Sequence, residues 1–478
     1  MNMGTGIFVD REDEFAFLDE QYRQRSPSFV VLYGRRRVGK TALITQFIKK
    51  KRALYFLATE ESEVQNCAAF RALAADITGN ELLRSSQITD WLLIFKTLLE
   101  QPAKLPSAQK NSERLIIAID EFQYLARANP AFPSIMQKAW DTLLSKSNVM
   151  LILCGSSISM MESAVLAYES PLYGRRTGQI KLKQIPFSHY GNFFPGKSED
   201  KLTELYALTG GIPKYIEFFE EGSVHDQIAK NILSPSGFLY NEPAFLLHQE
   251  VSEIGSYFSL IKSIAAGNHK LADIASDLEL KQTGLSKYLN TLINLEFIER
   301  EVPVTEEKPE KSKRGLYRIK DNFLQFWFRF VFPYMSDLEI KKTKTVEDRI
   351  RKNFIDSHVS FVYEDICRER MWQIDFEKPW GFTISRCGRW WDKNNEIDIV
   401  AYDGAGKDII FGECKYTSQK MGLDVFKTLE EKSRSVVWQN DIRRPHFILF
   451  SKSGFTAALK ALAENRQDLM LIGKGYER

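Results

Sequence analysis

Short apolar runs recur along the first part of the chain, and stretches with helical periodicity separate them. The runs are continuous and rich in β-branched residues, which is typical of strands buried on both faces of a parallel sheet. They are Phe29–Tyr33, Ala53–Ala58, Leu115–Ile119 and Val149–Cys154, and a helix is expected from Thr41 to about Lys51. The pattern therefore predicts an α/β domain over residues 1–200.

The hydrophobic pattern changes twice after residue 200. Residues 201–250 become helical, with a Gly-Gly-Ile-Pro turn at Gly210–Pro213. Residues 251–335 predict three helices, a charged turn and a strand, and residues 336–478 predict a second α/β section. The strand-like runs of that section are Ile397–Tyr402, Ile409–Tyr416 and His446–Phe450, whereas the Pro-, Ser- and Lys-rich residues 101–114 predict a surface loop.

Composition narrows the class of protein. The 478 residues are 44% hydrophobic and 27% charged, which excludes disorder as the dominant state. The net charge is only +3, so a polybasic nucleic-acid coat is excluded, although residues 311–352 hold 12 Lys or Arg against 5 Asp or Glu. The apolar run Phe323–Met335 carries Arg329 and is too short to span a bilayer, so we expect buried core and no membrane partner.

The N-terminus and the cysteines indicate the compartment. Acidic residues stand where a signal peptide would be basic and then apolar, so secretion is not expected. The five cysteines lie far apart and form no C-x-x-C pair, which argues against a disulfide framework or structural zinc. A reducing, cytoplasmic location is the expectation.

One glycine-rich motif lies between a predicted strand and a predicted helix, which is the context that a phosphate-binding loop requires. Its glycines would let backbone N–H groups surround phosphates at a helix N-terminus. Lys40 would contact the β- and γ-phosphates, and the Thr41 hydroxyl would bind Mg²⁺. The motif, and thus the predicted binding site for ATP and Mg²⁺, consists of Gly34, Arg35, Arg36, Arg37, Val38, Gly39, Lys40 and Thr41.

A second motif supports ATP hydrolysis rather than binding alone. The apolar strand Leu115–Ile119 ends in Asp120 and Glu121. A carboxylate at this position suits the Mg²⁺ shell of a P-loop enzyme, so Asp120 is the expected metal ligand. Glu121 is the expected base that polarises the attacking water. Alone, such a pair would indicate no more than a helix N-terminus.

The order of motifs along the chain resembles the archaeal-type ATPases, which are P-loop proteins of the AAA+/STAND kind. The matching segments include residues 8–14, 34–41, 119–125, 154–161, 171–178 and 209–215. The resemblance implies that Ser156 or Ser157 senses the γ-phosphate, that Asp10 and Arg11 lie near the nucleotide base, and that Gly210–Pro213 opens a helical lid. From chemistry alone the two serines fit a helix N-cap equally well.

Arg175 and Arg176 are candidates for a group that stabilises charge on the γ-phosphate in the transition state. A guanidinium is the preferred group for this role, acting within the chain or from a neighbouring subunit. Two adjacent arginines are also common in solvated turns. The side chains of Arg35–Arg37, inside the phosphate-binding loop, are expected to face solvent or a partner.

Residues 257–300 fit a helix-turn-helix, because Leu260, Ile264, Ile274, Leu285 and Leu289 fall on the inner faces of three helices. Polar side chains at the start of the third helix would then meet DNA base edges, and the following charged turn resembles a wing that meets phosphates. Those residues are Gln282, Thr283, Ser286 and Lys287 on the helix, and Lys311, Lys313 and Arg314 in the turn. Winged helices also serve as protein-contact modules, so both DNA and protein partners stay open.

The last section resembles the PD-(D/E)xK nuclease fold. Glu413 and Lys415 lie two apart on one predicted strand and therefore share a face, with Asp398 on the strand before. The resemblance implies that Asp398 and Glu413 hold Mg²⁺, that Lys415 activates water, and that Glu364 supplies a further carboxylate. Ile397 replaces the proline of the family's name. An alternative is a degenerate nuclease-like scaffold.

The expected architecture is a P-loop parallel-sheet ATPase domain (1–200), a helical lid (201–250), a winged helix (251–335) and a C-terminal α/β restriction-nuclease-like domain (336–478). Three functions fit it. The first is an ATPase that couples turnover to DNA binding or metal-dependent DNA cleavage. The second is an ATP-dependent switch that binds DNA or protein beside an inactive nuclease fold. The third is a signalling or assembly ATPase whose later domains bind only proteins. A protein partner, or self-association through the ATPase domain, is also considered.

Overall fold

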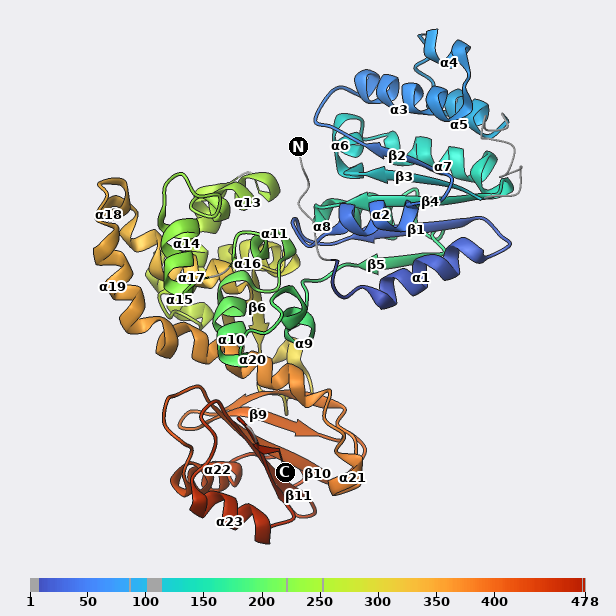
Figure 1. Cartoon of the computed structure of the whole chain (residues 1–478). Helices are drawn as coiled ribbons and strands as arrows, with labels where there is room; N and C mark the ends of the chain where they lie inside the picture. The colour runs from blue at the N-terminus through green and yellow to red at the C-terminus, as the bar shows by residue number, and fades with distance from the viewer. Residues whose placement is uncertain are drawn as a thin grey trace. The chain divides into compact units, whose positions relative to one another are not determined.

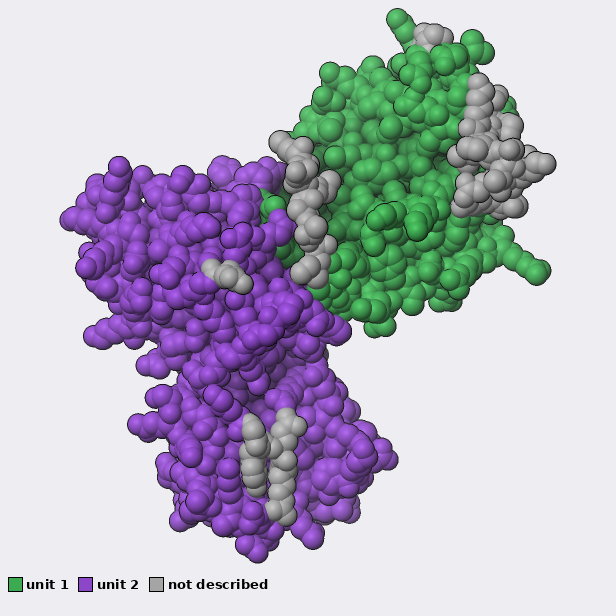
Figure 2. Space-filling model, viewed as in Figure 1, with its two compact units in different colours: residues 1–185, 212–214 green, residues 186–211, 215–478 purple. Residues whose placement is uncertain are grey.

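The computed structural model describes residues 8–85, 87–100, 114–220, 222–251, 253–474 and 476–477 (Figure 1). The chain forms two compact units (Figure 2). Unit 1 holds residues 1–185 and 212–214, and unit 2 holds residues 186–211 and 215–478. The surface loop expected over residues 101–114 lies outside the described residues, apart from Arg114. The four-part division expected from the sequence stays a prediction.

Unit 1 is built on a five-stranded parallel sheet, as the apolar runs predict. Its strand order is β2-β3-β4-β1-β5, and all neighbouring strands run parallel. The fifth strand was not expected, because it is short and mostly half-buried or exposed. The strands are β1 (Ser28–Tyr33), β2 (Ala53–Leu57), β3 (Leu115–Asp120), β4 (Val149–Gly155) and β5 (Gly178–Lys181).

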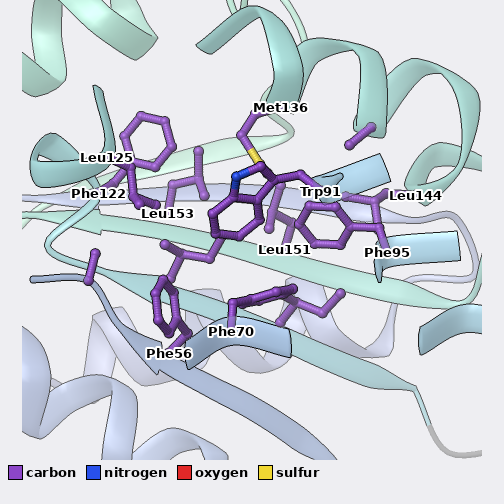
Figure 3. Close-up of a cluster of buried hydrophobic side chains, with 14 of the residues drawn as sticks. Phe56, Phe70, Trp91, Phe95, Phe122, Leu125, Met136, Leu144, Leu151 and Leu153 are labelled. Atoms are coloured by element: carbon purple, nitrogen blue, oxygen red, sulfur yellow. The ribbon is translucent and has the colours of Figure 1, made fainter. Parts of the chain in front are cut away.

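Both faces of this sheet are covered by helices, because successive strand residues point to opposite faces. Val30 and Leu32 of β1 pack with α1 (Glu12–Arg23) and α2 (Lys40–Ile48), whereas Phe29 and Val31 belong to the core on the other face. That second core is rich in aromatic rings and is centred on Trp91 (Figure 3). The helices on its side are α3 (Glu63–Thr78), α5 (Trp91–Glu100), α6 (Phe122–Ala128) and α7 (Phe132–Thr142), with the short α4 (Glu81–Ser85) and α8 (Ile158–Met161) nearby in sequence.

Parallel strands place the candidate residues at one edge of the sheet. The carboxyl ends of β1, β3 and β4 are Tyr33, Asp120 and Gly155. The loop that follows each strand therefore opens at the same edge, where ligands bind in open α/β sheets. This brings the glycine-rich loop, the acidic pair and the serines together from three distant stretches of sequence.

Unit 2 begins with helices and continues into a compact group of three helices and a two-stranded antiparallel sheet. In that group Leu285, Leu289 and Leu292 are buried, as the helical periodicity predicts. The first helices are α9 (Phe187–Tyr190), α10 (Glu199–Thr209), α12 (Val224–Ile228) and α13 (Glu242–Glu250), while α11 (Pro213–Ile216) crosses the unit boundary. The group itself consists of α14 (Ile254–Ala265), α15 (Leu271–Asp277), α16 (Gln282–Asn294), β6 (Ile298–Glu301) and β7 (Leu316–Ile319).

The remainder of unit 2 ends in a mixed six-stranded sheet of order β13-β12-β11-β10-β9-β8. β10, β11 and β12 run parallel, and β8, β9 and β13 are antiparallel to their neighbours. The strands are β8 (Arg386–Trp391), β9 (Glu396–Tyr402), β10 (Asp408–Lys415), β11 (Arg444–Ser451), β12 (Leu469–Gly473) and β13 (Tyr476–Glu477). The helices are α17 (Asn322–Phe330), α18 (Met335–Glu339), α19 (Thr343–Phe354), α20 (Ser360–Met371), α21 (Glu377–Trp380), α22 (Leu423–Ser433) and α23 (Ala457–Asn465).

His358, between α19 and α20, is fully buried and lies among aromatic rings. Its Nε2 lies 2.7 Å from the Ala207 carbonyl oxygen, which can only accept a hydrogen bond, so Nε2 carries the proton. Nδ1 has no hydrogen-bond partner among the described residues. Burial lowers the pKa of His358 to about 4, so the folded chain holds this ring neutral.

Unfolding frees this histidine to take up a proton below its ordinary pKa of about 6.5. Its contribution to stability is thus complete above pH 6.5 and is lost as the pH falls toward 4. We expect the unfolding free energy of unit 2 to fall by on the order of 2 kcal/mol between pH 7 and pH 5. The measurement is urea unfolding followed by tryptophan fluorescence. The His358→Gln variant, which can still donate to Ala207, should lack that part of the pH dependence. An equal pH dependence in both proteins would contradict the assignment.

In the part of the chain that the structure describes, no helix has the length and apolar character needed to cross a bilayer.

Candidate functional site

The glycine-rich loop closes tightly at the end of β1. Gly34 has φ +151°, and a Cβ there would lie 2.3 Å from the Leu182 carbonyl oxygen, so no larger residue fits without moving the backbone. Gly39 has φ +95° and stands at the N-terminus of α2. These two positions let the loop turn back on itself and direct backbone N–H groups of the first helical turn into its concave side.

Lys40 lies inside the loop and is only 6% exposed. Its Nζ donates hydrogen bonds to the carbonyl oxygens of Gly34 (2.9 Å) and Arg35 (2.7 Å). Burial lowers the pKa of Lys40, and the nearby charges of Glu121 and Asp120 oppose that shift. The ammonium is therefore held at the centre of the loop by carbonyl groups that phosphate oxygens could replace.

Thr41 and Asp120 meet across the end of the sheet, as the two sequence motifs predict. The Thr41 hydroxyl donates a hydrogen bond of 2.7 Å to Asp120 Oδ2. Tyr55 of β2 donates a second bond, 2.9 Å long, to the same oxygen. Tyr55 was not expected from the sequence, because no motif marks it. The hydroxyl and carboxylate are hard oxygen ligands of the kind that Mg²⁺ prefers.

Glu121 is held by two side chains from neighbouring segments. The Ser156 hydroxyl, just after β4, donates a 2.7 Å hydrogen bond to Glu121 Oε2. The Gln123 amide donates to the same oxygen and also lies 3.0 Å from Ser156 Oγ. Of the two serines considered from the sequence, Ser156 thus touches the acidic residue, whereas Ser157 makes no side-chain cap on α8. Gln123 was missed, although it stands two residues after Glu121.

Arg11 connects the N-terminal segment to the loop. It is 5% exposed, and its guanidinium donates to the carbonyl oxygens of Val38 (3.3 Å) and Lys183 (2.7 Å). Asp10 lies beside it, with an oxygen 3.7 Å from Arg11 Nη1. The loop arginines were expected to face solvent or a partner, and Arg35 does not face solvent, since it is 6% exposed. Arg36 contacts the Tyr124 hydroxyl at 3.3 Å.

Arg175 and Arg176 lie at the opposite edge of the sheet. They precede β5, and the next residue, Thr177, bonds through its backbone N–H to Phe29 near the start of β1. Arg175 is paired with Asp141 at the end of α7, with 2.8 Å between Nη2 and Oδ2. The six residues of β1 separate this edge from the phosphate-binding loop by roughly 17–20 Å. The expected role within the same chain is therefore wrong, and a role toward a neighbouring subunit stays a prediction.

In unit 2 the polar residues at the start of α16 are all exposed, as expected from the helical periodicity. They are Gln282, Thr283, Ser286 and Lys287. In the turn between β6 and β7, Lys311 and Lys313 are exposed, while Arg314 lies 3.2 Å from Glu306 and 6.0 Å from the Trp390 ring.

Hydrogen bonds and ion pairs connect the strand pair β6–β7 to the C-terminal part of unit 2. The Val304 N–H, after β6, donates to the Arg389 carbonyl of β8 at 2.9 Å, and the Tyr402 hydroxyl donates to the Val304 carbonyl at 3.1 Å. Arg318 of β7 forms ion pairs with Asp365 of α20 and with Glu299 and Glu301 of β6. These half-buried charges pair with one another, which is the condition under which ions are tolerated away from water.

The predicted C-terminal residues lie close together around β9 and β10. Asp398 Oδ2 accepts a 2.9 Å hydrogen bond from the Cys414 N–H. Glu413 is 7% exposed and its Oε1 lies 2.6 Å from Lys415 Nζ, while its Oε2 lies 3.8 Å from Lys432 Nζ. Burial, followed by repulsion from Glu413, raises the pKa of Asp398. The site therefore holds carboxylates whose mutual repulsion is only partly offset.

Glu364 departs from the expected ligand set. Its Oε2 lies 3.8 Å from Arg368 Nη1, and Arg368 also donates to the Asp398 carbonyl oxygen at 2.9 Å. Burial, followed by the charge of Asp398, raises the pKa of Glu364. Among the described residues, the oxygens of Glu364, Asp398 and Glu413 do not gather within 4.8 Å of one another. The three carboxylates are therefore not gathered around one point in this arrangement, and the expected role of Glu364 as a metal ligand stays a prediction.

The five-stranded parallel sheet, the glycine-rich loop after β1 and the acidic residues after β3 are the fold and site of a P-loop ATPase. Residues 8–219 match a family described as an ATPase domain predominantly from Archaea. Residues 327–433 match a second family, described as archaeal and bacterial proteins of unknown function. The resemblance to archaeal-type ATPases drawn from the motifs is thus confirmed for the ATPase part.

A relative shows that the match extends over most of the chain. The uncharacterized protein MJECL04 of Methanocaldococcus jannaschii is 35% identical over 432 residues, which cover 90% of this chain and 92% of that protein. This chain belongs to the same family of archaeal-type ATPases. The uncharacterized ATP-binding protein MJ0423 of the same organism is 43% identical over 49 residues, or 10% of this chain and 83% of that protein.

Two solved structures align with a large part of this chain. The Walker-type ATPase of Pyrococcus abyssi has 20% identity and a TM-score of 0.49, over 67% of this chain and 96% of that one. The ORC2 protein of Aeropyrum pernix has 13% identity and a TM-score of 0.34, over 71% of this chain and 94% of that one.

Proposed function

We propose that unit 1 binds ATP with Mg²⁺ and hydrolyses it. The observation that carries this proposal is the 2.7 Å hydrogen bond between Thr41 and Asp120, which joins the phosphate-binding loop to the end of β3. Thr41 and Asp120 would hold Mg²⁺, Lys40 would contact the β- and γ-phosphates, and N–H groups of residues 34–41 would surround the phosphates. Arg11 donates a hydrogen bond to the Val38 carbonyl oxygen of the loop, which fits a place for Asp10 and Arg11 beside the nucleotide.

Glu121 is the proposed general base. Its carboxylate lies one residue after Asp120, so it faces the same edge of the sheet as the metal ligands. Ser156 and Gln123 fix its orientation through hydrogen bonds to one oxygen, and they leave the other oxygen to accept a proton from water. Ser156 would report on the γ-phosphate through this contact. A neighbouring copy of the chain would supply Arg175 or Arg176, if either acts in catalysis.

The direct test is ATP turnover by the full-length chain. We expect Mg²⁺-dependent release of phosphate that stops when the metal is chelated, because Thr41 and Asp120 can bind the nucleotide productively only through the metal. Nucleotide binding without turnover, in the presence of Mg²⁺ and of DNA, would contradict the role of Glu121. Absence of nucleotide binding would overturn the proposal as a whole.

We propose further that residues 251–335 form a winged helix that contacts DNA. Support comes from the exposed polar start of α16 and the exposed lysines between β6 and β7. The helices over residues 201–250 would act as the lid that transmits the nucleotide state. A protein-contact role is the alternative, and the fastening of Val304 to β8 favours a fixed relation between the winged helix and the C-terminal sheet.

Replacing Lys311, Lys313 and Arg314 with Ala should flatten the salt dependence of DNA binding. The slope of log affinity against log salt should fall by roughly 0.9 for each phosphate that the variant no longer binds. Most of the change should come from the two lysines, because Arg314 already pairs with Glu306. The measurement is fluorescence anisotropy of labelled duplex DNA at several salt concentrations. An unchanged slope would place the DNA away from this turn.

The second candidate activity is metal-dependent cleavage of DNA at Asp398, Glu413 and Lys415. The favouring observation is the half-buried Asp398 near the buried Glu413, with Lys415 2.6 Å from the second carboxylate. Two carboxylates suit Mg²⁺, and an adjacent ammonium suits a water nucleophile. The alternative is an inactive scaffold, in which Lys415, Lys432 and Arg368 neutralise the carboxylates without a metal. ATP-dependent switching would then be the function of the whole chain.

A further inference from the structure

A cavity of about 670 Å³ lies in unit 2 between the end of α17 and one side of α19. Three cations line it, namely Arg329, Arg349 and Lys352. Among the described residues, Asp348 is the one acidic member of its lining. The cavity lies at the start of the region matched to the family of unknown function, and apart from the residues of the two candidate active sites.

None of these three cations forms an ion pair with an acidic side chain in the described part of the chain. This contrasts with the other arginines of unit 2 near the C-terminal sheet, since Arg318 and Arg389 are each paired with two or more carboxylates. A phosphate bound among guanidinium and ammonium groups without carboxylate partners would accept charge-assisted hydrogen bonds from them.

One of the cations is oriented without a carboxylate. The Arg349 guanidinium lies 4.5 Å from the centre of the Tyr334 ring, a cation–π contact that orients it and leaves its N–H groups for a ligand. Arg329 is exposed, so its guanidinium can also reach a ligand. Arg329 lies in an otherwise apolar run of α17, where it was expected from the sequence only as part of a buried core.

Neutral donors complete the lining, and they indicate which anion fits. Thr345, Asn353 and Ser357 line the same cavity. Hydroxyl and amide groups beside arginines are the usual partners of DNA phosphate oxygens. Exposed lysines at positions 341, 342 and 344 precede the cavity along the chain and add to the positive charge of this stretch.

We propose that the surface lined by Arg329, Arg349 and Lys352, called here the α17–α19 groove, binds the phosphate backbone of duplex DNA. The inference rests on the proposed DNA contact of the winged helix and adds a second place of contact. Phosphates in the groove would accept charge-assisted hydrogen bonds from the three cations. The contacts carry no base information, so the groove would add affinity and orientation rather than sequence preference.

The test compares the full-length chain with the triple variant Arg329→Gln, Arg349→Gln and Lys352→Gln. DNA affinity is measured by anisotropy with a labelled duplex over a series of salt concentrations. We expect the slope of log affinity against log salt to fall by roughly 0.9 for each phosphate that these side chains neutralise in the wild type. The single variant Lys352→Gln, at an exposed position, should lower the slope by roughly 0.9 and serves if the triple variant does not fold.

The matched control removes three exposed lysines of unit 1, with Lys49→Gln, Lys138→Gln and Lys146→Gln. The control should keep the wild-type slope, and both triple variants should keep wild-type ATP turnover. A wild-type slope in the groove variant, or an equal loss in the control, would overturn the groove while leaving the proposed winged-helix contact standing. Absence of DNA binding by the wild type would overturn both contacts and leave the ATPase proposal intact. Calorimetric binding of inorganic pyrophosphate without DNA binding would overturn the duplex in favour of a small-anion site.

Discussion

Replacing Glu121 with Gln should lower ATP turnover by about 10²–10⁴-fold while ATP still binds. The amide keeps the shape of the side chain and can still accept a hydrogen bond from Ser156, so the loop and the metal ligands should stay in place. The lost group is the carboxylate that takes a proton from water. Single-turnover hydrolysis and equilibrium binding of labelled ATP separate the two effects.

The matched variant is Lys40→Ala, which should lose both affinity and rate because Lys40 is the proposed phosphate contact. The carbonyl oxygens of Gly34 and Arg35 would then lose the hydrogen bonds that the Lys40 ammonium donates. The pair of variants distinguishes a base from a binding group. Wild-type turnover by Glu121→Gln would show that another group activates the water, and Glu121 would be left as a partner of Ser156 and Gln123.

DNA cleavage, if the C-terminal site is active, should be abolished by Asp398→Ala or Glu413→Ala, with ATP turnover unchanged. Each variant removes a proposed ligand of the divalent metal. Lys415→Ala should instead keep metal binding and cleave poorly, because an ammonium positions water and stabilises charge without holding the ion. The measurements are cleavage of linear, supercoiled and single-stranded DNA with Mg²⁺ or Mn²⁺, and calorimetry for the metal.

A structural role for the same residues gives a different pattern. If Lys415 only neutralises Glu413, the Lys415→Ala variant should lose stability. The buried carboxylate would keep only the more distant Lys432 ammonium, 3.8 Å away, as a nearby partner. Absence of both metal binding and cleavage in the wild-type chain, with and without ATP, would sink the nuclease activity. The ATP-dependent switch beside an inactive scaffold would then be the function to pursue.

Local patterns were sufficient for the centre of the candidate ATP site. The apolar runs located four of the five strands of unit 1, and the loop and acidic pair fell at their carboxyl ends, because parallel strands bring those ends together. The hydrogen bond between Thr41 and Asp120, which are 79 positions apart, could be expected from the motifs alone. The motifs do not include the side chains that hydrogen-bond to Asp120 and Glu121 and hold them in place. Tyr55 reaches Asp120 from the neighbouring strand β2, which no spacing in the sequence encodes. Gln123 lies in the same stretch as Glu121, but its residue type alone does not mark it.

The differences from expectation arise from neighbours that residue type alone does not reveal. Arg175 has the right chemistry for phosphate, but the strand direction carries it to the other edge, where Asp141 binds it. Glu364 has the right chemistry for a metal, and that role stays a prediction, with Arg368 on the same helix as a competing partner. The apolar neighbours of Arg329 predict only a core helix, because residue type does not show on which side of a helix a cavity opens.

The hydrogen bond between Val304 and β8 has a consequence for how the chain can be cut into fragments. β8 is an edge strand of the C-terminal sheet, and an uncovered edge strand is a template for pairing with other chains. The segment after β6 occupies part of that edge, and the side chain of Val304 packs against the core beneath it. This segment therefore protects the C-terminal sheet from aggregation. A fragment that starts at residue 336 would keep the carboxylates of the candidate metal site. It would nevertheless expose the partly apolar edge of β8 to pairing with other chains.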